Sequence, residues 1–546
     1  MTTGAWDAIV VGAGPNGLVA ANLLADAGWR TLVLEAQAEP GGAVRTAEVT
    51  APGFRNDLFS AFYPLAAPPT PISRLGLDQW GLRWAHAPAV VANPLLDEPA
   101  AMLHRSPEAT ASRLEQATPG DGDGWMRLHD RWRREGRALM AAFMGPFPPL
   151  RAGARALARI GWRDLLPFAR FLMLPVRRLA DEHVRGRGAG LLLAGNALHA
   201  DVPPDAAPSG FLGWLLVSLG HDVGFPAPVG GAGELTAALV RRLEARGGAL
   251  TCGARVDRVV VEGGRAVGVE VDGCPVRAGR AVLADVDAEV LYRSLVGADL
   301  LPAAFIDTLD HFQRGWGTLK VDWALRSPLP WRDPDVAGAG TVHLAASIDE
   351  LAMTCAEVMA GRLPAHPFVV LGQMTTTDPC RSPAGTESAW GYTHVPALVD
   401  DGRGRRALAP ADVDEMVRRV EQRIEDHAPG FRDLILARHV LPPSGMEERD
   451  ANLVAGDMTG GTNQLHQQLV FRPTPGLGGP GTPVRGLYLA SSSAHPGGGV
   501  HGACGTNAAR AALARERRAR LLAAVPRLAV GGQRPARRPP SPATDG

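Results

Sequence analysis

The sequence predicts an α/β fold in which a discontinuous domain with a parallel sheet is joined to an α+β domain carrying a helical insertion. A strand–helix–strand pattern occupies the first 46 residues, and helical periodicity dominates the middle of the chain. Short apolar segments and a glycine cluster follow towards the C-terminus. The 546 residues leave room for several domains, since a domain averages about 150 residues.

The first 46 residues predict a βαβ unit. Asp7 to Val11 is an apolar run that ends at a glycine, which is typical of a buried strand. Asn16 to Ala27 has apolar residues at helical spacing and closes at Gly28, a residue suited to a helix C-terminus. Thr31 to Leu34 is a second buried strand, and it ends at Glu35.

A glycine motif joins the first strand to the helix. Gly12-Ala13-Gly14-Pro15-Asn16-Gly17 has the pattern GxGxxG, in which the glycines allow a tight turn, close approach of a pyrophosphate and close helix–strand packing. Glu35 follows 18 residues after the last glycine. A carboxylate at that place accepts hydrogen bonds from both ribose hydroxyls and repels a 2′-phosphate. The unit therefore predicts a Rossmann-type dinucleotide site that disfavours NADP.

Residues 76 to 227 predict a largely helical segment. They are rich in Arg, Leu, Ala, Pro and Trp, with helical periodicity over Ala109 to Met144 and Ala154 to Val184. Their apolar side chains suit a tunnel for a lipophilic substrate and equally suit an ordinary helical core. The residues considered for either role are Phe168, Phe171, Leu172 and Trp214.

From residue 230 onward, short strands alternate with helices. The turns Glu262-Gly263-Gly264 and Asp272-Gly273 favour hairpins. Residues 530 to 546 lack periodicity, which predicts a disordered tail. Strands are expected at Val256 to Val261, Ala266 to Val271, Arg280 to Ala284, Leu319 to Leu325 and Leu487 to Ala490, and helices at Leu235 to Arg246, Asp412 to His427 and about Gly505 to Val525.

Two further glycine motifs resemble those of a known enzyme family. Pro40-Gly41-Gly42-Ala43-Val44-Arg45-Thr46 follows Glu35, and the run from Gly486 to Gly502 contains a triple glycine. Together with the GxGxxG they resemble the phytoene-desaturase-like FAD-dependent oxidoreductases of the glutathione-reductase-like superfamily. Within that family the chain is most similar to the pyridine nucleotide-disulfide oxidoreductase domain-containing protein 2 group.

The resemblance implies FAD as the cofactor and indicates the residues that contact it. Ser492 stands where many relatives carry an aspartate that holds the ribityl chain. Val256 corresponds to a backbone contact with the adenine and fits a plain core position equally well. The implied cofactor-binding residues are Gly12, Gly14, Pro15, Asn16, Gly17, Glu35, Gly41, Gly42, Arg45, Val256, Ser492, Gly497, Gly498, Gly499 and Val500.

Lys320 and His495 are the candidate catalytic residues. Lys320 is the one lysine among 56 basic residues, and its strand resembles the place where flavin amine oxidases hold a water beside flavin N5. The alternative is a strand lysine that points to solvent. His495 is a candidate base, with loop orientation as its alternative, whereas His501 is expected to be structural. Tyr392 and Trp390 are expected in the pocket or in the core, and no histidine spacing predicts a metal site.

Composition excludes several functions. The 56 basic residues equal the 56 acidic ones, so there is no overall attraction to nucleic acid. The five cysteines form no CxxC pair, which argues against a disulfide framework and favours a reducing, cytoplasmic location. We find no signal peptide and no apolar run of about 18 residues, so no transmembrane segment is expected and contact with a membrane surface stays open.

The sequence therefore predicts an FAD-dependent oxidoreductase that moves a hydride from a lipophilic small molecule to flavin N5. Oxygen, a quinone or another acceptor would reoxidise the flavin. The alternatives are an FAD-dependent isomerase without net redox and a flavin-bearing regulator without turnover. The expected FAD-binding segments are 1–75, 228–295 and 452–527, with a substrate domain of 76–227 and 296–451 and a tail of 528–546.

Overall fold

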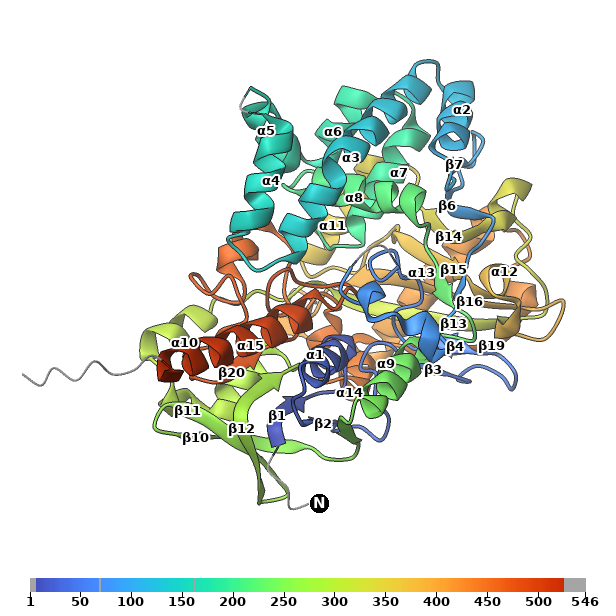
Figure 1. The fold of residues 1–546 in the computed structure, drawn as a ribbon. Helices are drawn as coiled ribbons and strands as arrows, with labels where there is room; N and C mark the ends of the chain where they lie inside the picture. Colours follow the sequence, from blue (N-terminus) through green and yellow to red (C-terminus); the bar gives the residue numbers. More distant parts are fainter. Residues whose placement is uncertain (1–5, 68–69, 162, 525–546) are drawn as a thin grey trace, which may run out of the picture.

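The computed structural model of the chain describes residues 6–67, 70–161 and 163–524 (Figure 1). Two sheets lie side by side, and a layer of helices covers one face of the second sheet. The predicted tail, 528–546, lies outside the described residues. Among those residues, no helix is both long and apolar enough to cross a membrane.

The first sheet is parallel at its centre and is extended by antiparallel strands. β1 lies between β12 and β2, β20 flanks β12, β9 flanks β2, and all these pairs are parallel. β12 also continues into the antiparallel partners β11 and β10. The strands are β1 (Trp6–Val11), β2 (Thr31–Leu34), β9 (Ala249–Thr251), β10 (Val256–Glu262), β11 (Arg265–Val271), β12 (Cys274–Ala284) and β20 (Leu487–Leu489).

Both predicted hairpins are present in this sheet. Gly263 and Gly264 have φ angles of 55° and 71°, and Asp272 and Gly273 have φ angles of 51° and 71°. Two consecutive positive φ values are what a two-residue type I′ turn requires, which explains the glycines at these places. The second turn starts β12 earlier than the expected Arg280, because residues 274–277 pair with β11.

Helices cover one face of the first sheet and bury the apolar side of the βαβ unit. Leu18 and Leu24 of α1 pack with Leu235 of α9 and Ala508 of α15. A π-helix, Val290–Gly297, lies on the other face. This arrangement confirms the predicted Rossmann-type α/β fold. The helices on the first face are α1 (Pro15–Asp26), α9 (Gly233–Ala245) and α15 (Ala503–Ala524), and α10 (Ala303–Leu309) packs beside the π-helix.

The second sheet has the order β19-β13-β16-β15-β14-β6-β7 and is antiparallel except for the β14–β6 pair. Two of its strands, β6 and β7, lie in the segment expected to be largely helical. They pair with each other, and β6 also pairs with β14, about 250 residues later in the chain, which a local pattern does not reveal. The strands are β6 (Ala89–Asn93), β7 (Ala101–Leu103), β13 (Gly317–Leu325), β14 (Ala339–Leu344), β15 (Val369–Gln373), β16 (Glu387–Val395) and β19 (Ile435–Leu441).

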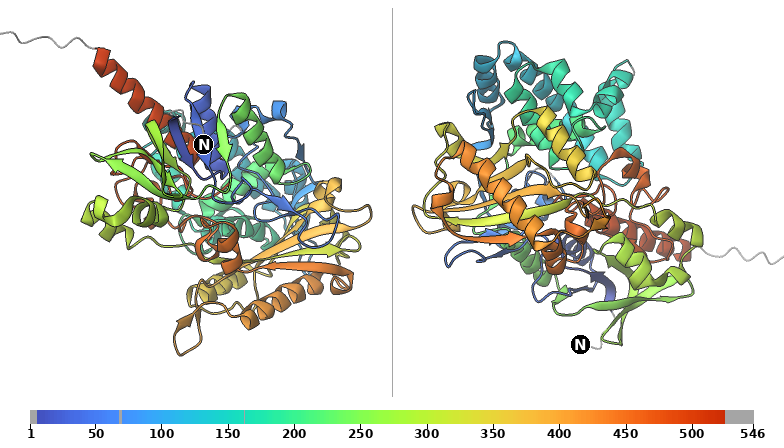
Figure 2. Two further views of the ribbon diagram at one scale, coloured as in Figure 1. Left: turned by 90° about the horizontal axis from the view of Figure 1, so that it is seen from below. Right: turned by 180° about the vertical axis from the view of Figure 1, so that it is seen from behind.

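Different helices pack on the two faces of the second sheet. On one face, Val420 of α13 packs in the same core as Trp323. The right view of Figure 2, in which the molecule is seen from behind, shows this helix lying across the sheet. The other face meets the helical layer. The helices around this sheet outside that layer are α11 (Ile348–Met359), α12 (Met374–Thr377), α13 (Pro410–His427) and α14 (Pro443–Arg449).

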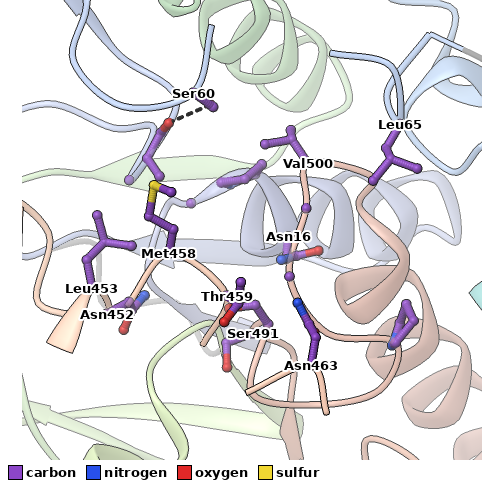
Figure 3. Close-up of a pocket in the computed structure, with 18 of the residues that line it drawn as sticks. Asn16, Ser60, Leu65, Asn452, Leu453, Met458, Thr459, Asn463, Ser491 and Val500 are labelled. Atoms are coloured by element: carbon purple, nitrogen blue, oxygen red, sulfur yellow. Dashed lines mark hydrogen bonds between the residues drawn. The ribbon is translucent and has the colours of Figure 1, made fainter. Parts of the chain in front are cut away.

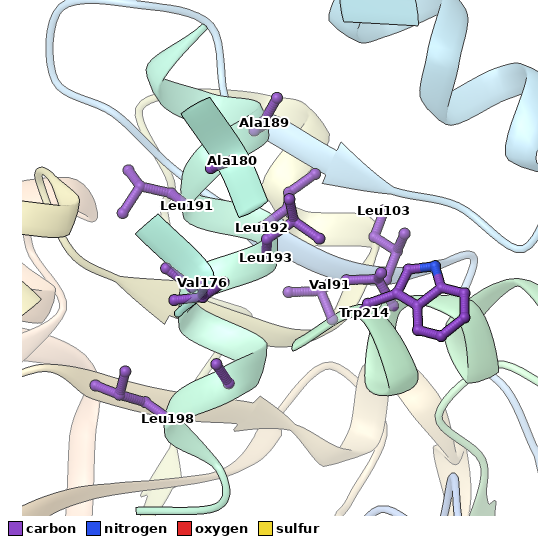
Figure 4. Packing of buried hydrophobic residues seen from close by; sticks show 14 of the residues in the cluster. Val91, Leu103, Val176, Ala180, Ala189, Leu191, Leu192, Leu193, Leu198 and Trp214 are labelled. Atoms are coloured by element: carbon purple, nitrogen blue, oxygen red, sulfur yellow. The ribbon is translucent and has the colours of Figure 1, made fainter. Parts of the chain in front are cut away.

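The helical layer is held by a core that it shares with the sheet. Leu193 and Trp214 pack against Val91 and Leu103 (Figure 4). Trp214 is fully buried and makes an edge-to-face contact with Phe171 at 4.9 Å, a type of pair that contributes about 0.5–1.5 kcal/mol. The helices are α2 (Pro107–Ala117), α3 (Asp121–Met144), α4 (Leu150–Ile160), α5 (Leu165–Met173), α6 (Val176–His183), α7 (Arg187–Leu198) and α8 (Ser209–Asp222).

Three pairs of short strands lie outside the two large sheets in the described residues. They are β3 (Thr46–Ala47) with β4 (Asn56–Asp57), β5 (Trp84–Ala85) with β8 (Ala227–Pro228), and β17 (Val399–Asp400) with β18 (Arg405–Arg406).

Candidate functional site

A cavity of about 1020 Å³ is lined by both sheets and by the helical layer. Its polar end lies where parallel strands of the first sheet finish, at Val11, Leu34 and Asp285. Figure 3 shows Asn16, Asn452, Thr459 and Ser491, which come from distant segments, converging on it. Ligands of open α/β sheets bind at the carboxyl ends of the strands, so this end is the natural place for a dinucleotide.

The glycine loop is shaped by close contacts with its own backbone and with Asp285. A Cβ atom at Gly17 would lie 2.2 Å from the carbonyl oxygen of Gly12, and one at Gly14 would lie 2.7 Å from Asp285 Oδ2. Gly12 itself has a φ of 94°. The N–H of Gly17 donates to Asp285 Oδ2 at 2.7 Å. Side chains are therefore excluded here by the protein's own atoms.

Glu35 stands beside this loop at the end of β2. Its carboxylate accepts hydrogen bonds from the N–H of Ala13 at 2.7 Å and of Gln37 at 2.8 Å. The residue is buried and lines the cavity. A carboxylate has about four acceptor sites, so lone pairs remain for two ribose hydroxyls.

The second glycine pair packs on the first. Gly42 has a φ of 52°, and a Cβ there would lie 3.2 Å from Gly14 Cα. Gly42 lines the cavity, whereas Gly41 lies behind it. Arg45 does not line the cavity: it donates to the carbonyl oxygens of Gly42 at 2.9 Å and of Arg449 at 2.6 Å. Arg449 and Arg255 do line the cavity.

The C-terminal glycine cluster forms another part of the wall. Gly498, Gly499 and Val500 line the cavity together with Ser492. Gly497 lies behind them. A Cβ atom at Gly497 would lie 3.2 Å from the guanidinium carbon of Arg472. These loops are tied together by Arg472, which is fully buried and donates to carbonyl oxygens of Thr459, Gly460, Gly461, Thr462 and Ser492.

Sequence reasoning missed several polar residues at this end, among them Asp285, Asp450 and Asn452. Asp285 directly follows β12, and burial raises its pKa to about 8. Asp450 also lines the cavity, and burial raises its pKa. Asn452 donates to the carbonyl oxygen of Asp285 at 3.1 Å and accepts from the N–H of Asp287 at 2.8 Å. The position of Asp285 directly after an expected parallel strand was the signal that could have found it.

The structure brings most of the predicted cofactor residues to the cavity. The GxGxxG loop, the second glycine pair, β10 and the C-terminal cluster all contribute to its lining. Gly17, Gly41, Arg45 and Gly497 support the wall from behind. The predicted residues that line it are Gly12, Gly14, Pro15, Asn16, Glu35, Gly42, Val256, Ser492, Gly498, Gly499 and Val500.

The other end of the cavity is mainly apolar. Helices α3, α5 and α8 supply its lining, and Figure 4 shows the packed core behind them. Of the residues considered for a tunnel, Leu172 lines the cavity, whereas Phe168, Phe171 and Trp214 do not. The apolar lining from these helices includes Leu139, Ala142, Phe143, Leu172, Phe211, Leu212, Leu215 and Leu216.

Polar side chains of the second sheet interrupt this apolar lining. Lys320 lines the cavity and is only 2% exposed, so the alternative that it points to solvent is wrong. Its ammonium forms an ion pair with Asp322. Trp390 and Tyr392 also line the cavity, and their rings are stacked with centroids 6.0 Å apart.

The two histidines of the C-terminal cluster lie away from the cavity wall. The His495 ring packs edge-on against Phe143 at 6.0 Å and Phe147 at 6.1 Å, and burial lowers its pKa to about 4. His501 Nδ1 accepts from the N–H of Ala503 at 3.0 Å, at the first turn of α15. That contact is a structural one.

Known proteins resemble the chain over most of its length. Residues 10–68 match the family described as "NAD(P)-binding Rossmann-like domain". The chain is 29% identical to "Pyridine nucleotide-disulfide oxidoreductase domain-containing protein 2" of Mus musculus, with 92% of each covered. It is 24% identical to the lycopene-forming phytoene desaturase of Paracoccus sp. (strain N81106 / MBIC 01143), covering 92% of this chain and 96% of that protein.

The chain is homologous to these oxidoreductases. The predicted resemblance and the predicted enzyme class are thereby confirmed. Among solved structures, wild-type putrescine oxidase bound to putrescine has the same fold, with a TM-score of 0.58 at 16% identity over 94% of this chain and 99% of that one. All five cysteines of this oxidoreductase are unpaired and none lines the cavity, so the cavity presents no thiol pair.

Proposed function

We propose that the chain is an FAD-dependent oxidoreductase that removes a hydride from a lipophilic small molecule. The observation that carries this proposal is that a single cavity joins the polar end and the apolar end. It is lined by the glycine loop and Glu35 at one end and by apolar residues of α3, α5 and α8 at the other. A cofactor at the first end and a substrate at the second would share one water-poor space.

The polar end fits FAD. The Gly12–Gly17 loop leaves no room for side chains, so backbone can approach a diphosphate, and the start of α1 directs its partial positive charge there. Glu35 would hold the adenosine ribose. The side-chain oxygen of Asn16 is buried without a hydrogen-bond partner in the described residues and belongs to the cavity lining, which supports a polar ligand.

When bound, FAD supplies a ring that accepts a hydride at N5. The chain's own part is to bind and orient the two reactants and to exclude water. Gly498, Gly499 and Val500 would contact the ring side of the cofactor, and Lys320 remains the proposed catalytic residue. His495 is not part of this proposal, since its ring lies among Phe143 and Phe147 rather than at the cavity.

The test begins with the cofactor. Denatured protein should release FAD, identified by chromatography, and FMN or NAD alone would contradict the proposal. The holoprotein should then be photoreduced without oxygen and mixed with acceptors and lipophilic donors. Reduction of the flavin by a donor supports hydride removal, whereas turnover without any acceptor would favour the isomerase alternative.

A further inference from the structure

A polar strip lies on the face of the second sheet that lines the cavity. Thr318 and Lys320 of β13 and Tyr392 of β16 all belong to the lining. Residues two apart on a strand share a face, and Lys320 is paired directly with Tyr392 in the antiparallel register. The strip therefore places an ammonium group and a phenol next to each other, with a threonine beside them.

Two members of the strip have hydrogen-bonding capacity that the described residues do not use. The Thr318 hydroxyl is fully buried and has no partner there. The Lys320 ammonium carries three N–H donors, of which one reaches Asp322. Unpaired buried polar groups cost about 1–3 kcal/mol each, so they indicate a polar ligand.

A chain of two histidines sets the direction of the Tyr392 hydroxyl. Tyr392 Oη lies 3.3 Å from His199 Nδ1, and His199 Nε2 lies 2.8 Å from His343 Nε2. His343 is fully buried, whereas His199 is part-buried and lines the cavity. Desolvation lowers the pKa of His199 to about 4 and that of His343 well below its usual value. Each ring is therefore neutral and carries one proton.

The unpartnered nitrogen decides which tautomers fit. His343 Nδ1 is buried and has no partner among the described residues, so a proton there would be an orphan donor. Placing that proton on His343 Nε2 makes it donate to His199 Nε2. The His199 proton is then on Nδ1 and donates to Tyr392 Oη, which leaves the Tyr392 O–H free to donate into the cavity.

We propose that this strip binds an uncharged oxygen of the substrate, so that the substrate is an apolar molecule with a hydroxyl or carbonyl group. The inference rests on the proposed function, because it concerns the substrate of the same cavity. Tyr392, Lys320 and Thr318 would all donate to that oxygen. Asp322, the carboxylate paired with Lys320, is not part of the lining, so the strip offers an ammonium substrate no counter-charge.

Equilibrium binding to the flavin-loaded protein tests this inference. The probes share one skeleton: butylbenzene, 4-phenylbutan-1-ol, 4-phenylbutan-2-one and 4-phenylbutylamine. Flavin absorption and tryptophan fluorescence report binding. The alcohol and the ketone should bind about tenfold more tightly than butylbenzene, as expected for one or two added hydrogen bonds.

Isosteric variants assign the effect to the strip. Tyr392→Phe and Thr318→Val should each lose most of that preference and keep the affinity for butylbenzene. Thr393→Val is the matched control, because Thr393 is also buried without a partner in the described residues but lies on the opposite face of β16 and outside the lining. This control should bind all four probes like the wild type.

Three results would overturn the inference: equal affinity for the hydrocarbon and the oxygenated probes, tightest binding of the amine, or no measurable binding of any probe. Failure of the proposed function would be seen in a different measurement, the cofactor content of the purified protein. Protein purified without FAD would contradict that function, whereas tryptophan fluorescence would still rank the four probes.

Discussion

At the scale of single residues, two carboxylates at the dinucleotide end of the cavity have different surroundings. Glu35 accepts from the backbone N–H groups of Ala13 and Gln37 and lines the cavity. Asp285 accepts from Gly17, and burial raises its pKa to about 8. In the proposed function, the first carboxylate would bind the ribose, whereas the second is neutral at neutral pH beneath the Gly12–Gly17 loop.

Replacing Glu35 should weaken FAD retention. A hydrogen bond to a charged group contributes about 1.5–3 kcal/mol, so Glu35→Ala should raise the FAD dissociation constant about ten- to a hundredfold. Fluorescence titration of the apoprotein measures this constant. Glu39→Ala, which changes an exposed acid nearby, is the control and should leave it unchanged. A wild-type constant in Glu35→Ala would remove Glu35 from the ribose site.

Asp285 should make FAD binding depend on pH. Its pKa of about 8 in the folded protein exceeds its usual value of about 4, so the carboxyl is neutral below pH 8 and negative above it. The folded state loses stability as pH rises between these two values, since the unfolded chain has already released its proton. FAD affinity should fall as pH rises through about 8, because a charged Asp285 repels the diphosphate.

Asp285→Asn provides the comparison for that pH profile. The amide oxygen can still accept from the N–H of Gly17 and does not titrate. FAD affinity in this variant should stay constant between pH 6 and 9, the range in which the FAD affinity of the wild type should fall. Parallel profiles in the two proteins would show that another group controls the pH dependence.

At the scale of elements, the start of α1 depends on the space left by Gly17. A Cβ there would lie 2.2 Å from the Gly12 carbonyl oxygen, so the loop and the helix would have to separate. Gly17→Ala should lower the free energy of unfolding by about 1–3 kcal/mol and abolish FAD retention. Urea denaturation and the bound flavin content measure the two effects.

Gly28, at the other end of α1, is the matched control. A Cβ there meets nothing within 4 Å, although its φ of 77° costs a non-glycine residue about 1–2 kcal/mol. Gly28→Ala should therefore lose a similar amount of stability and keep its FAD. Loss of FAD from both variants would mean that general instability, rather than the loop, controls binding.

At the scale of the whole molecule, the part of the chain that the structure describes contains one sheet with a parallel centre, and one GxGxxG loop lies at the carboxyl ends of its strands. The proposed FAD would fill that site. NADH and NADPH should therefore reduce the flavin slowly, as stopped-flow absorption under nitrogen would show. Rapid bleaching by either nucleotide at micromolar concentration would require a nicotinamide site elsewhere.

Local sequence patterns alone predicted the βαβ unit, the two hairpins and the glycine motifs. These features depend on spacing within about 45 residues: glycines at φ values that other residues avoid, apolar runs of strand length and helical periodicity. The family resemblance carried by these motifs supplied most of the other predicted cofactor residues, and most of the predicted residues line the cavity. Arg45 shows the limit, because position in a motif did not reveal that its guanidinium binds backbone carbonyls instead.

Tertiary structure alone decided the partners that come from distant segments. β6 and β7 lie in a stretch that the sequence predicts to be helical, and β6 joins the second sheet through β14, which lies about 250 residues away. Asp285 meets Gly17 across 268 residues. The ion pair of Lys320 with Asp322 is local to one strand, but the burial of Lys320, which is only 2% exposed, belongs to the folded structure. Burial, hydrogen-bond direction and cavity lining arise from such long-range packing, which the periodicity of a single segment cannot specify.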